Sequence, residues 1–353
     1  MHLLNLYHKS EYFAIICLME KEYQNDRKAA VKKLKLLAYN GKNDVEAFRK
    51  KMDAAFSTVF LPNGVERSDY KYGNISCEVL SPEIYASNRV MLYLHGGSFV
   101  GGSPATYRSF CASLATKCFC RVVVPDYRLA PNSPYPAANE DIQSVFRALY
   151  TEEQIACSLN AERGTAAAQS EIIIAADGSA ASLACSLIFN LRDRYRANIK
   201  KVILFSPWLD ISNSSTLCTS KKLNDEIFTP DVFKKCSSVY TFESNGQNPY
   251  VSPLYATKED LVNFPPLIIQ MGAKEVLLEN ARAFTDKVRE AGSQCQLDVW
   301  PDMMFMFQMA DEYLHESHLA LDKIGKFITG GSDLQRQKFE NKPKLERGLN
   351  SEA

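Results

Sequence analysis

The sequence has 353 residues, 46% of them hydrophobic, and its 41 basic residues balance its 41 acidic ones. This length suffices for one large domain or for a domain with a cap. The balanced charge gives no whole-chain argument for nucleic acid or an anionic membrane as a partner. No apolar run is long enough to span a membrane. No Cys/His cluster has the spacing of a zinc site, and no cofactor is expected.

The ten cysteines are scattered along the chain, and we expect most of them to be buried thiols in a reducing compartment. A secreted protein with disulfides stays an alternative. The apolar stretch 12–19 follows Lys9 and Glu11 and lacks a small-residue cleavage site. We interpret it as a helix rather than a signal peptide, so the expected location is cytoplasmic.

Residues 1–58 carry helical patterns without a strand pattern and are interpreted as an N-terminal helical arm. Asp44 is a candidate N-cap for a helix in which Phe48, Met52 and Phe56 share one face. Such a face usually serves packing, but it can also close a pocket as a lid. After a turn at residues 62–64, the stretch 67–82 predicts one or two strands of a hairpin.

The remaining chain alternates between strand and helix patterns. Apolar runs predict buried strands at 90–94, 121–125, 172–174, 201–205, 266–271 and 296–300. Helices are predicted at 139–150, 183–193, 279–290 and 311–328. This alternation predicts an α/β domain over residues 59–330, with a mostly parallel central sheet flanked by helices. The polar stretch 212–264 suits a helical cap insertion, and the polar tail 331–353 is expected to be disordered.

The stretch 172–183 combines a strand, a run of small residues and the start of a helix. This order is typical of a nucleophile elbow, in which a sharp turn exposes the nucleophile above the sheet. The tip of the elbow falls on Gly178, which has no nucleophilic side chain. A positive φ at such a tip costs other residues about 1–3 kcal/mol, and glycine avoids that strain.

A glycine-rich loop follows the first buried strand, with four glycines in the eight residues 95–102. Such a loop leaves backbone N–H groups free to point at one spot. It is no phosphate loop, because no Gly-Lys-Ser/Thr follows. After the next strand, Asp126 and Arg128 are interpreted as a structural ion pair.

In this order and spacing, the motifs resemble the hormone-sensitive-lipase-like branch of the α/β-hydrolases, which includes arylacetamide deacetylases and bacterial carboxylesterases. The similarity covers roughly residues 60–330. It rests on His95-Gly-Gly-Ser-Phe-Val-Gly-Gly, Asp126-Tyr-Arg-Leu-Ala-Pro, Tyr135-Pro-Ala-Ala, Ser206-Pro-Trp-Leu-Asp, Asn248-Pro-Tyr-Val-Ser-Pro-Leu-Tyr-Ala and Pro265-Pro-Leu-Ile-Ile-Gln. The resemblance implies an α/β-hydrolase fold with a Ser, Asp/Glu, His triad in that chain order.

Carried over position by position, the triad is degenerate: the nucleophile position holds Gly178, the acid position Glu275 and the base position Phe305. Acyl transfer needs a nucleophile and a base that takes its proton, and neither glycine nor phenylalanine supplies one. Without a histidine partner, Glu275 is expected to have a raised pKa if it is buried. The Met and Phe residues of 303–309 are interpreted as core, with the lining of a ligand pocket as the alternative.

Three residues offer alternatives to this mapping. A one-residue shift makes Ser179 the nucleophile, but it places Asp177 where close packing favours a small residue. His315 and His318 are weak candidates for the base, because they lie about ten residues past the expected loop.

The other role of Ser179 is in its backbone N–H, which with those of Gly96 and Gly97 would complete an oxyanion hole. His95 belongs to the same loop in a structural role. The main hypothesis is therefore an inactive α/β-hydrolase that binds a small apolar carbonyl or carboxylate ligand there, or binds a protein partner. The alternative is a carboxylic ester hydrolase that uses Ser179 or a water positioned by Glu275. A structural role in a homo-oligomer is a third interpretation, and no nucleic-acid partner is expected.

Overall fold

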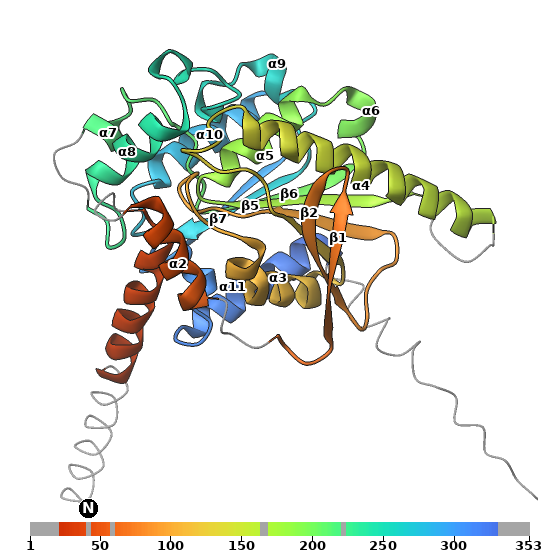
Figure 1. Ribbon diagram of the computed structural model, residues 1–353, viewed down its shortest axis with the longest axis horizontal. Helices are drawn as coiled ribbons and strands as arrows, with labels where there is room; N and C mark the ends of the chain where they lie inside the picture. Colours follow the sequence, from red (N-terminus) through yellow and green to blue (C-terminus); the bar gives the residue numbers. More distant parts are fainter. Residues whose placement is uncertain (1–20, 40–43, 57–60, 163–168, 220–223, 331–353) are drawn as a thin grey trace, which may run out of the picture.

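A computed structural model describes residues 21–39, 44–56, 61–162, 169–219 and 224–330. Its eight-stranded sheet has the order β1-β2-β4-β3-β5-β6-β7-β8 (Figure 1). The strands are β1 Val65–Tyr72, β2 Ile75–Pro82, β3 Arg89–Leu94, β4 Arg121–Pro125, β5 Glu171–Asp177, β6 Ile199–Phe205, β7 Leu267–Gly272 and β8 Cys295–Trp300. Strand β2 pairs antiparallel with β1 and β4, and all later pairings are parallel. The predicted hairpin and the mostly parallel sheet are confirmed.

Helices cover both faces of the sheet, with α3 and α11 on one face and α4 and α5 on the other (Figure 1). The longer helices are α2 Val45–Phe56, α3 Pro104–Cys118, α4 Ala137–Glu162, α5 Ala180–Asn190, α8 Pro230–Tyr240, α10 Leu278–Glu290 and α11 His315–Thr329. The short ones are η1 Lys35–Leu37, α6 Asp193–Arg196, α7 Thr216–Thr219, η2 Glu243–Asn245, η3 Pro253–Tyr255, α9 Lys258–Leu261 and η4 Phe307–Met309. One more helix includes residues 21–34.

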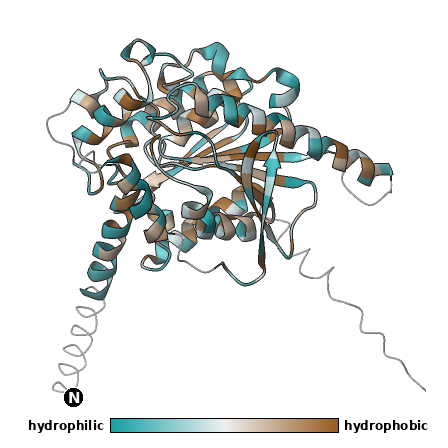
Figure 2. Cartoon of the chain, in the orientation of Figure 1, coloured by the Kyte–Doolittle hydropathy of each residue, from teal (hydrophilic) through white to brown (hydrophobic). Residues whose placement is uncertain are grey.

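The core lies in the central strands, whose β-branched and aromatic residues favour a pleated, buried surface. Strand β3 is buried along its whole length, and β5 is buried from Ile172 onward. The outer strand β1 is exposed at six of its eight positions. Figure 2 shows the same contrast, with apolar central strands and polar outer surfaces.

Helix α4 continues to Glu162, well beyond the predicted end at Tyr150. The added turns bring Glu153 against the sheet, where its buried carboxylate accepts a hydrogen bond from Arg121 of β4 at 2.7 Å. The sequence pattern missed this extension because the contact joins residues far apart in the chain.

Replacing Glu153 with Gln is expected to lower the free energy of unfolding by about 1–2 kcal/mol, since it leaves the Arg121 charge without its carboxylate. Urea unfolding measures the loss. Glu152→Gln on the same turn is the control, because that carboxylate accepts its hydrogen bond from the exposed hydroxyl of Tyr70. Equal effects of the two changes would contradict this role of Glu153.

Helix α11 begins at His315 rather than at residue 311. The N–H groups of Tyr313 and Leu314 both donate to the Ala310 carbonyl, so the chain makes a separate turn before the helix.

The predicted ion pair between Asp126 and Arg128 is wrong. Arg128 pairs with Asp141 of α4 at 2.7 Å, and its backbone N–H donates to the same carboxylate at 2.9 Å. Several hydrogen bonds to one carboxylate are stronger than an exposed pair of near neighbours.

The N-terminal arm contains the expected cap at Asp44, whose carboxylate accepts the Ala47 N–H at 2.8 Å. Phe48, Met52 and Phe56 of α2 are buried on one face, as predicted. The expectations for residues 1–20, 57–60 and 331–353 lie outside the described residues. The division into an arm, a hydrolase domain and a cap at 212–264 stays a prediction.

Where the chain is described, no helix combines the length and the apolar character needed to cross a lipid bilayer. The nine cysteines in this part of the chain have free thiols, and seven of them are buried.

Candidate active site

Gly178 forms the sharp turn between β5 and α5, with a φ of +49°. Its N–H donates to the Phe205 carbonyl at 3.0 Å, and its carbonyl accepts the Trp208 N–H at 2.9 Å. Both bonds tie the turn to β6 and the segment that follows it. Ser179 already has helical angles (φ −67°, ψ −29°). The strained residue at the tip is therefore Gly178, and Ser179 starts the helix.

Phe305 lies directly over this turn. A Cβ atom added to Gly178 would lie 3.2 Å from the Phe305 Cζ, closer than ordinary van der Waals contact. The Phe305 ring is buried and meets the Phe228 ring edge to face, with 4.6 Å between the centroids. The position expected for the base is thus filled by an apolar ring that leaves little room for a side chain at 178.

Glu275 follows β7 and is buried. Its Oε1 accepts hydrogen bonds from the Ser206 hydroxyl at 2.8 Å and from the Gly272 N–H at 2.5 Å. Its Oε2 is buried without a hydrogen-bond partner. Burial raises the pKa of Glu275 to about 8, as expected from the missing partner. The carboxyl group is therefore mostly protonated at neutral pH, and only its minor ionised fraction is able to act there as a base.

Ser179 is buried, and its Oγ accepts the Phe99 N–H at 3.1 Å. Among the described residues, no histidine forms a hydrogen bond with it. His318 lies on the surface, with Nε2 3.2 Å from the Asp311 carbonyl oxygen, and His315 is also exposed. Neither is placed to act as a base for the elbow.

His95 is buried and stacked between two tyrosines, with ring centroids 4.5 Å from Tyr127 and 5.6 Å from Tyr107. Its Nδ1 lies 2.9 Å from the Gly96 carbonyl oxygen. Burial lowers the pKa of His95 to about 4, so the ring is neutral at physiological pH. The ring thus packs against the start of the glycine loop, and its structural role stays a prediction.

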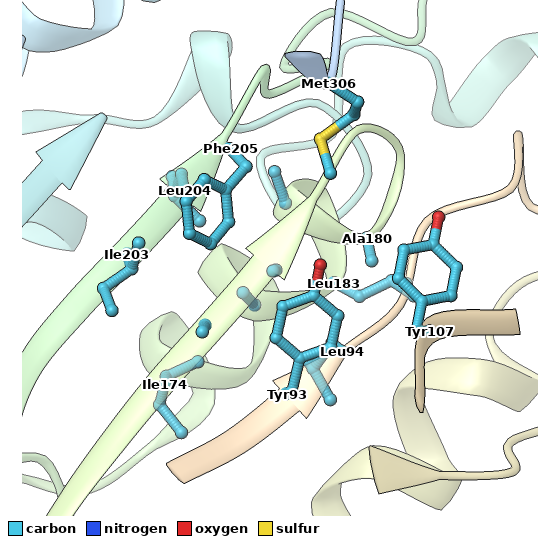
Figure 3. Packing of buried hydrophobic residues seen from close by; sticks show 14 of the residues in the cluster. Tyr93, Leu94, Tyr107, Ile174, Ala180, Leu183, Ile203, Leu204, Phe205 and Met306 are labelled. Atoms are coloured by element: carbon cyan, nitrogen blue, oxygen red, sulfur yellow. The ribbon is translucent and has the colours of Figure 1, made fainter. Parts of the chain in front are cut away.

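Asp177, at the end of β5, organises the loop in a way that the sequence analysis missed. Its buried carboxylate accepts hydrogen bonds from Tyr93 Oη at 2.7 Å, Tyr107 Oη at 3.0 Å and the Gly96 N–H at 2.7 Å. Figure 3 shows the two tyrosines side by side, with their hydroxyl groups pointing the same way. Burial raises the pKa of Asp177 to about 7. The signal for this role that the sequence offered was the position of Asp177, directly before the elbow tip at Gly178.

The bond to Asp177 also corrects the predicted oxyanion hole. The Gly96 N–H is already engaged and cannot hold a ligand oxygen. Gly97 and Ser179 do line the same cavity, together with Gly178 and Phe305. The oxyanion hole stays a prediction for the Gly97 and Ser179 amides, while Glu275 and His95 are not among the residues that line the cavity.

The cavity at the elbow is small, with a volume of about 10 Å³. That is close to the least space that holds one water molecule. The apolar wall combines the arm, the predicted cap and the segments that follow β7 and β8: Leu37, Phe228, Val232, Phe233, Leu277 and Phe305. The Met and Phe residues of 303–309 are buried, as expected for core. Among the described residues, no group of His, Cys, Asp or Glu side chains could hold a metal ion.

Comparison with known proteins agrees with this geometry. A family model described as an alpha/beta hydrolase fold matches residues 91–309. The chain is 29% identical over 274 residues to an acetyl-hydrolase of Streptomyces hygroscopicus, covering 78% of this chain and 85% of the relative. It is 29% identical over 245 residues to an esterase of Acinetobacter venetianus, covering 69% of this chain and 76% of the relative.

Solved structures give the same result. The fold superposes on the crystal structure of an esterase from the bacterial hormone-sensitive lipase family with a TM-score of 0.74 and 27% identity, covering 87% of this chain and 98% of that one. A hormone-sensitive lipase from a metagenome library matches with a TM-score of 0.71 and 26% identity, covering 88% and 98%.

Proposed function

The chain belongs to the α/β-hydrolase family, in its hormone-sensitive-lipase-like branch, and we propose that it binds an apolar carbonyl compound without hydrolysing it. One observation carries this proposal: the Phe305 ring lies 3.2 Å from the point at which a Gly178 side chain would begin. The positions predicted for the nucleophile and the base thus hold glycine and phenylalanine, and they pack against each other. Acyl transfer by the usual route lacks both groups.

The features that remain favour binding. Gly97 and Ser179 line a cavity whose wall is mostly apolar, with Ser98, Tyr107 and Asp177 as its other polar residues, and a site for one carbonyl oxygen needs such a wall. An uncharged ligand fits better than a carboxylate, because burying an anion beside Asp177 and Glu275 would cost hydration without a cation to replace it. A protein partner and a homo-oligomer, both considered from the sequence, stay predictions. We also propose a cytoplasmic location, supported by the nine free thiols.

Ester hydrolysis is the second candidate, and the names of the relatives favour it: they are an acetyl-hydrolase and an esterase. Neither name indicates an inactive protein. Ser179 lines the same cavity as Gly178, so its hydroxyl is the nucleophile this alternative requires. Against it, Ser179 has no base within hydrogen-bonding distance among the described side chains.

The test is turnover of p-nitrophenyl acetate and butyrate. We expect wild type to match the heat-denatured protein, Ser179→Ala to match wild type, and a fluorophosphonate probe to leave Ser179 unlabelled. Turnover that Ser179→Ala abolishes would establish the esterase alternative instead. Turnover that Glu275→Gln abolishes would indicate a water positioned by Glu275.

A further inference from the structure

The helix at residues 21–34 (red in Figure 1) is tied to the body of the protein by polar contacts along its length. Near its start, the Tyr23 hydroxyl donates to Glu316 at 3.3 Å. Near its end, Lys33 pairs with Glu312 at 3.0 Å. Leu37, just after this helix, forms part of the cavity wall. The arm therefore contributes directly to closing the cavity.

The strongest of these contacts is made by Arg27. Its two terminal nitrogens donate to the two carboxylate oxygens of Glu226 at 2.7 and 2.6 Å. One of them also donates to the Asp302 carbonyl at 2.9 Å, and Lys274 pairs with the Asp302 carboxylate at 3.2 Å. We call these four residues the Arg27 clasp. It joins the arm, the segment before α8, and the loops that follow β7 and β8.

The clasp is connected to the cavity through short stretches of chain. Glu226 lies two residues before Phe228, whose ring packs on Phe305. Asp225 fixes this segment, because its carboxylate accepts the N–H groups of Ile227 and Phe228 at 2.7 and 2.8 Å. A shift of Glu226 would therefore move a wall of the cavity.

The charge balance within the clasp also depends on Arg27. Its side chain is only 12% exposed, so solvent weakens the bidentate pair less than it weakens a surface ion pair. The hydrogen bond from Arg27 lowers the pKa of Glu226, while the charge of Asp302 acts in the opposite direction. Without Arg27, the carboxylates of Glu226 and Asp302 would repel each other, with the partly exposed Lys274 left to balance them.

We propose that the Arg27 clasp holds the cavity shut, and that its release admits an uncharged apolar carbonyl compound to the Gly97 and Ser179 amides. The inference rests on the proposed function for the nature of the ligand. It adds the contact that controls access to the site.

The probe is prodan, an uncharged propionyl naphthalene whose fluorescence shifts to the blue in apolar surroundings. We expect Arg27→Gln to bind prodan at least ~10-fold more tightly than wild type, because the closed form no longer competes with binding. Lys33→Gln is the matched control: it removes an ion pair of the same helix away from the clasp, and its affinity should equal that of wild type. Glu226→Gln provides a second release variant should Arg27→Gln fail to fold.

A cavity-filling change locates the bound probe. Val232→Trp in the Arg27→Gln background should abolish prodan binding, and Leu277→Trp serves if that protein is unfolded by circular dichroism. Binding that persists would place prodan elsewhere and overturn the inference, as would equal affinities for wild type and both release variants. Ester turnover is measured on the same proteins. Ester turnover by Arg27→Gln would refute the proposed lack of hydrolysis but not the proposed role of the clasp. Prodan binding equal to that of wild type, without turnover, would refute the role of the clasp but not the proposed function.

Discussion

Changing Gly178 to Ser and Phe305 to His together is expected to raise p-nitrophenyl butyrate hydrolysis at least ~100-fold above wild type. Either change alone is expected to leave turnover at the wild-type level. Gly178→Ser alone supplies a hydroxyl without a base, and its Cβ meets the Phe305 ring at 3.2 Å. Phe305→His alone supplies a base without a nucleophile. The two changes depend on each other sterically as well as chemically.

The surroundings needed by such a triad are present. Glu275 Oε2 is buried without a partner, so a histidine at 305 would find a carboxylate oxygen available for its ring N–H. A protonated imidazole would in turn favour the ionised form of Glu275. The tip has the φ of +49° that the elbow requires, although serine there adds about 1–3 kcal/mol of strain.

The controls separate this triad from other routes. Ser179→Ala added to the double variant should leave turnover unchanged, while Glu275→Gln should lower it. The double variant is also assayed with Arg27→Gln, so that a closed cavity does not hide a restored site. No gain in either background would show that Gly178 and Phe305 are not the former nucleophile and base positions.

Local patterns in the sequence were enough to predict the elbow and most of the sheet. The Ile172–Ile174 run and the small residues after it encode a buried strand and a tight turn within a dozen positions. The elbow also predicted the positive φ at Gly178, because that geometry follows from the turn itself.

Contacts between distant residues could not be predicted in this way. The Gly96 N–H looked free in the sequence because its partner Asp177 lies 81 positions away. The bond between Arg27 and Glu226 joins residues 199 positions apart and has no local pattern at all. Because such contacts leave no local pattern, a motif search identifies the position of the site without showing how its surroundings are packed.

The second large effect concerns stability and pH. The free energy of unfolding is expected to fall as pH rises from 6.5 to 8, because buried carboxyl groups stay protonated in the folded state. The folded pKa of Glu275 is about 8, against an ordinary value of 4.5, and that of Asp177 is about 7, against 3.8. Between the ordinary and the folded pKa, the folded protein holds a proton that the unfolded chain has released. Each such group lowers stability by about 1.4 kcal/mol per pH unit.

The sign reverses for His95, which is buried near the site. His95 has a folded pKa of about 4, against 6.5. Below pH 6.5 the unfolded chain takes up a proton at this histidine that the folded protein does not take up. The free energy of unfolding therefore falls as the pH decreases, and this loss offsets the gain from one of the two carboxyl groups. Above pH 6.5 His95 is neutral in both states and no longer changes the slope of stability against pH. The window from pH 6.5 to 8 therefore shows the effect of the carboxyl groups most clearly.

Glu275→Gln isolates one of these carboxyl groups, because the amide keeps an oxygen for Ser206 and Gly272 but does not titrate. Relative to wild type, the variant should gain about 2 kcal/mol of stability between pH 6.5 and 8, measured by urea unfolding at half-unit steps. Glu279→Gln is the control, since that side chain is 85% exposed and its removal should shift the curve without changing its slope. Parallel curves for wild type and Glu275→Gln would mean that Glu275 is ionised in the folded protein. An ionised Glu275 could then orient or activate a water at neutral pH, which would strengthen the hydrolytic alternative.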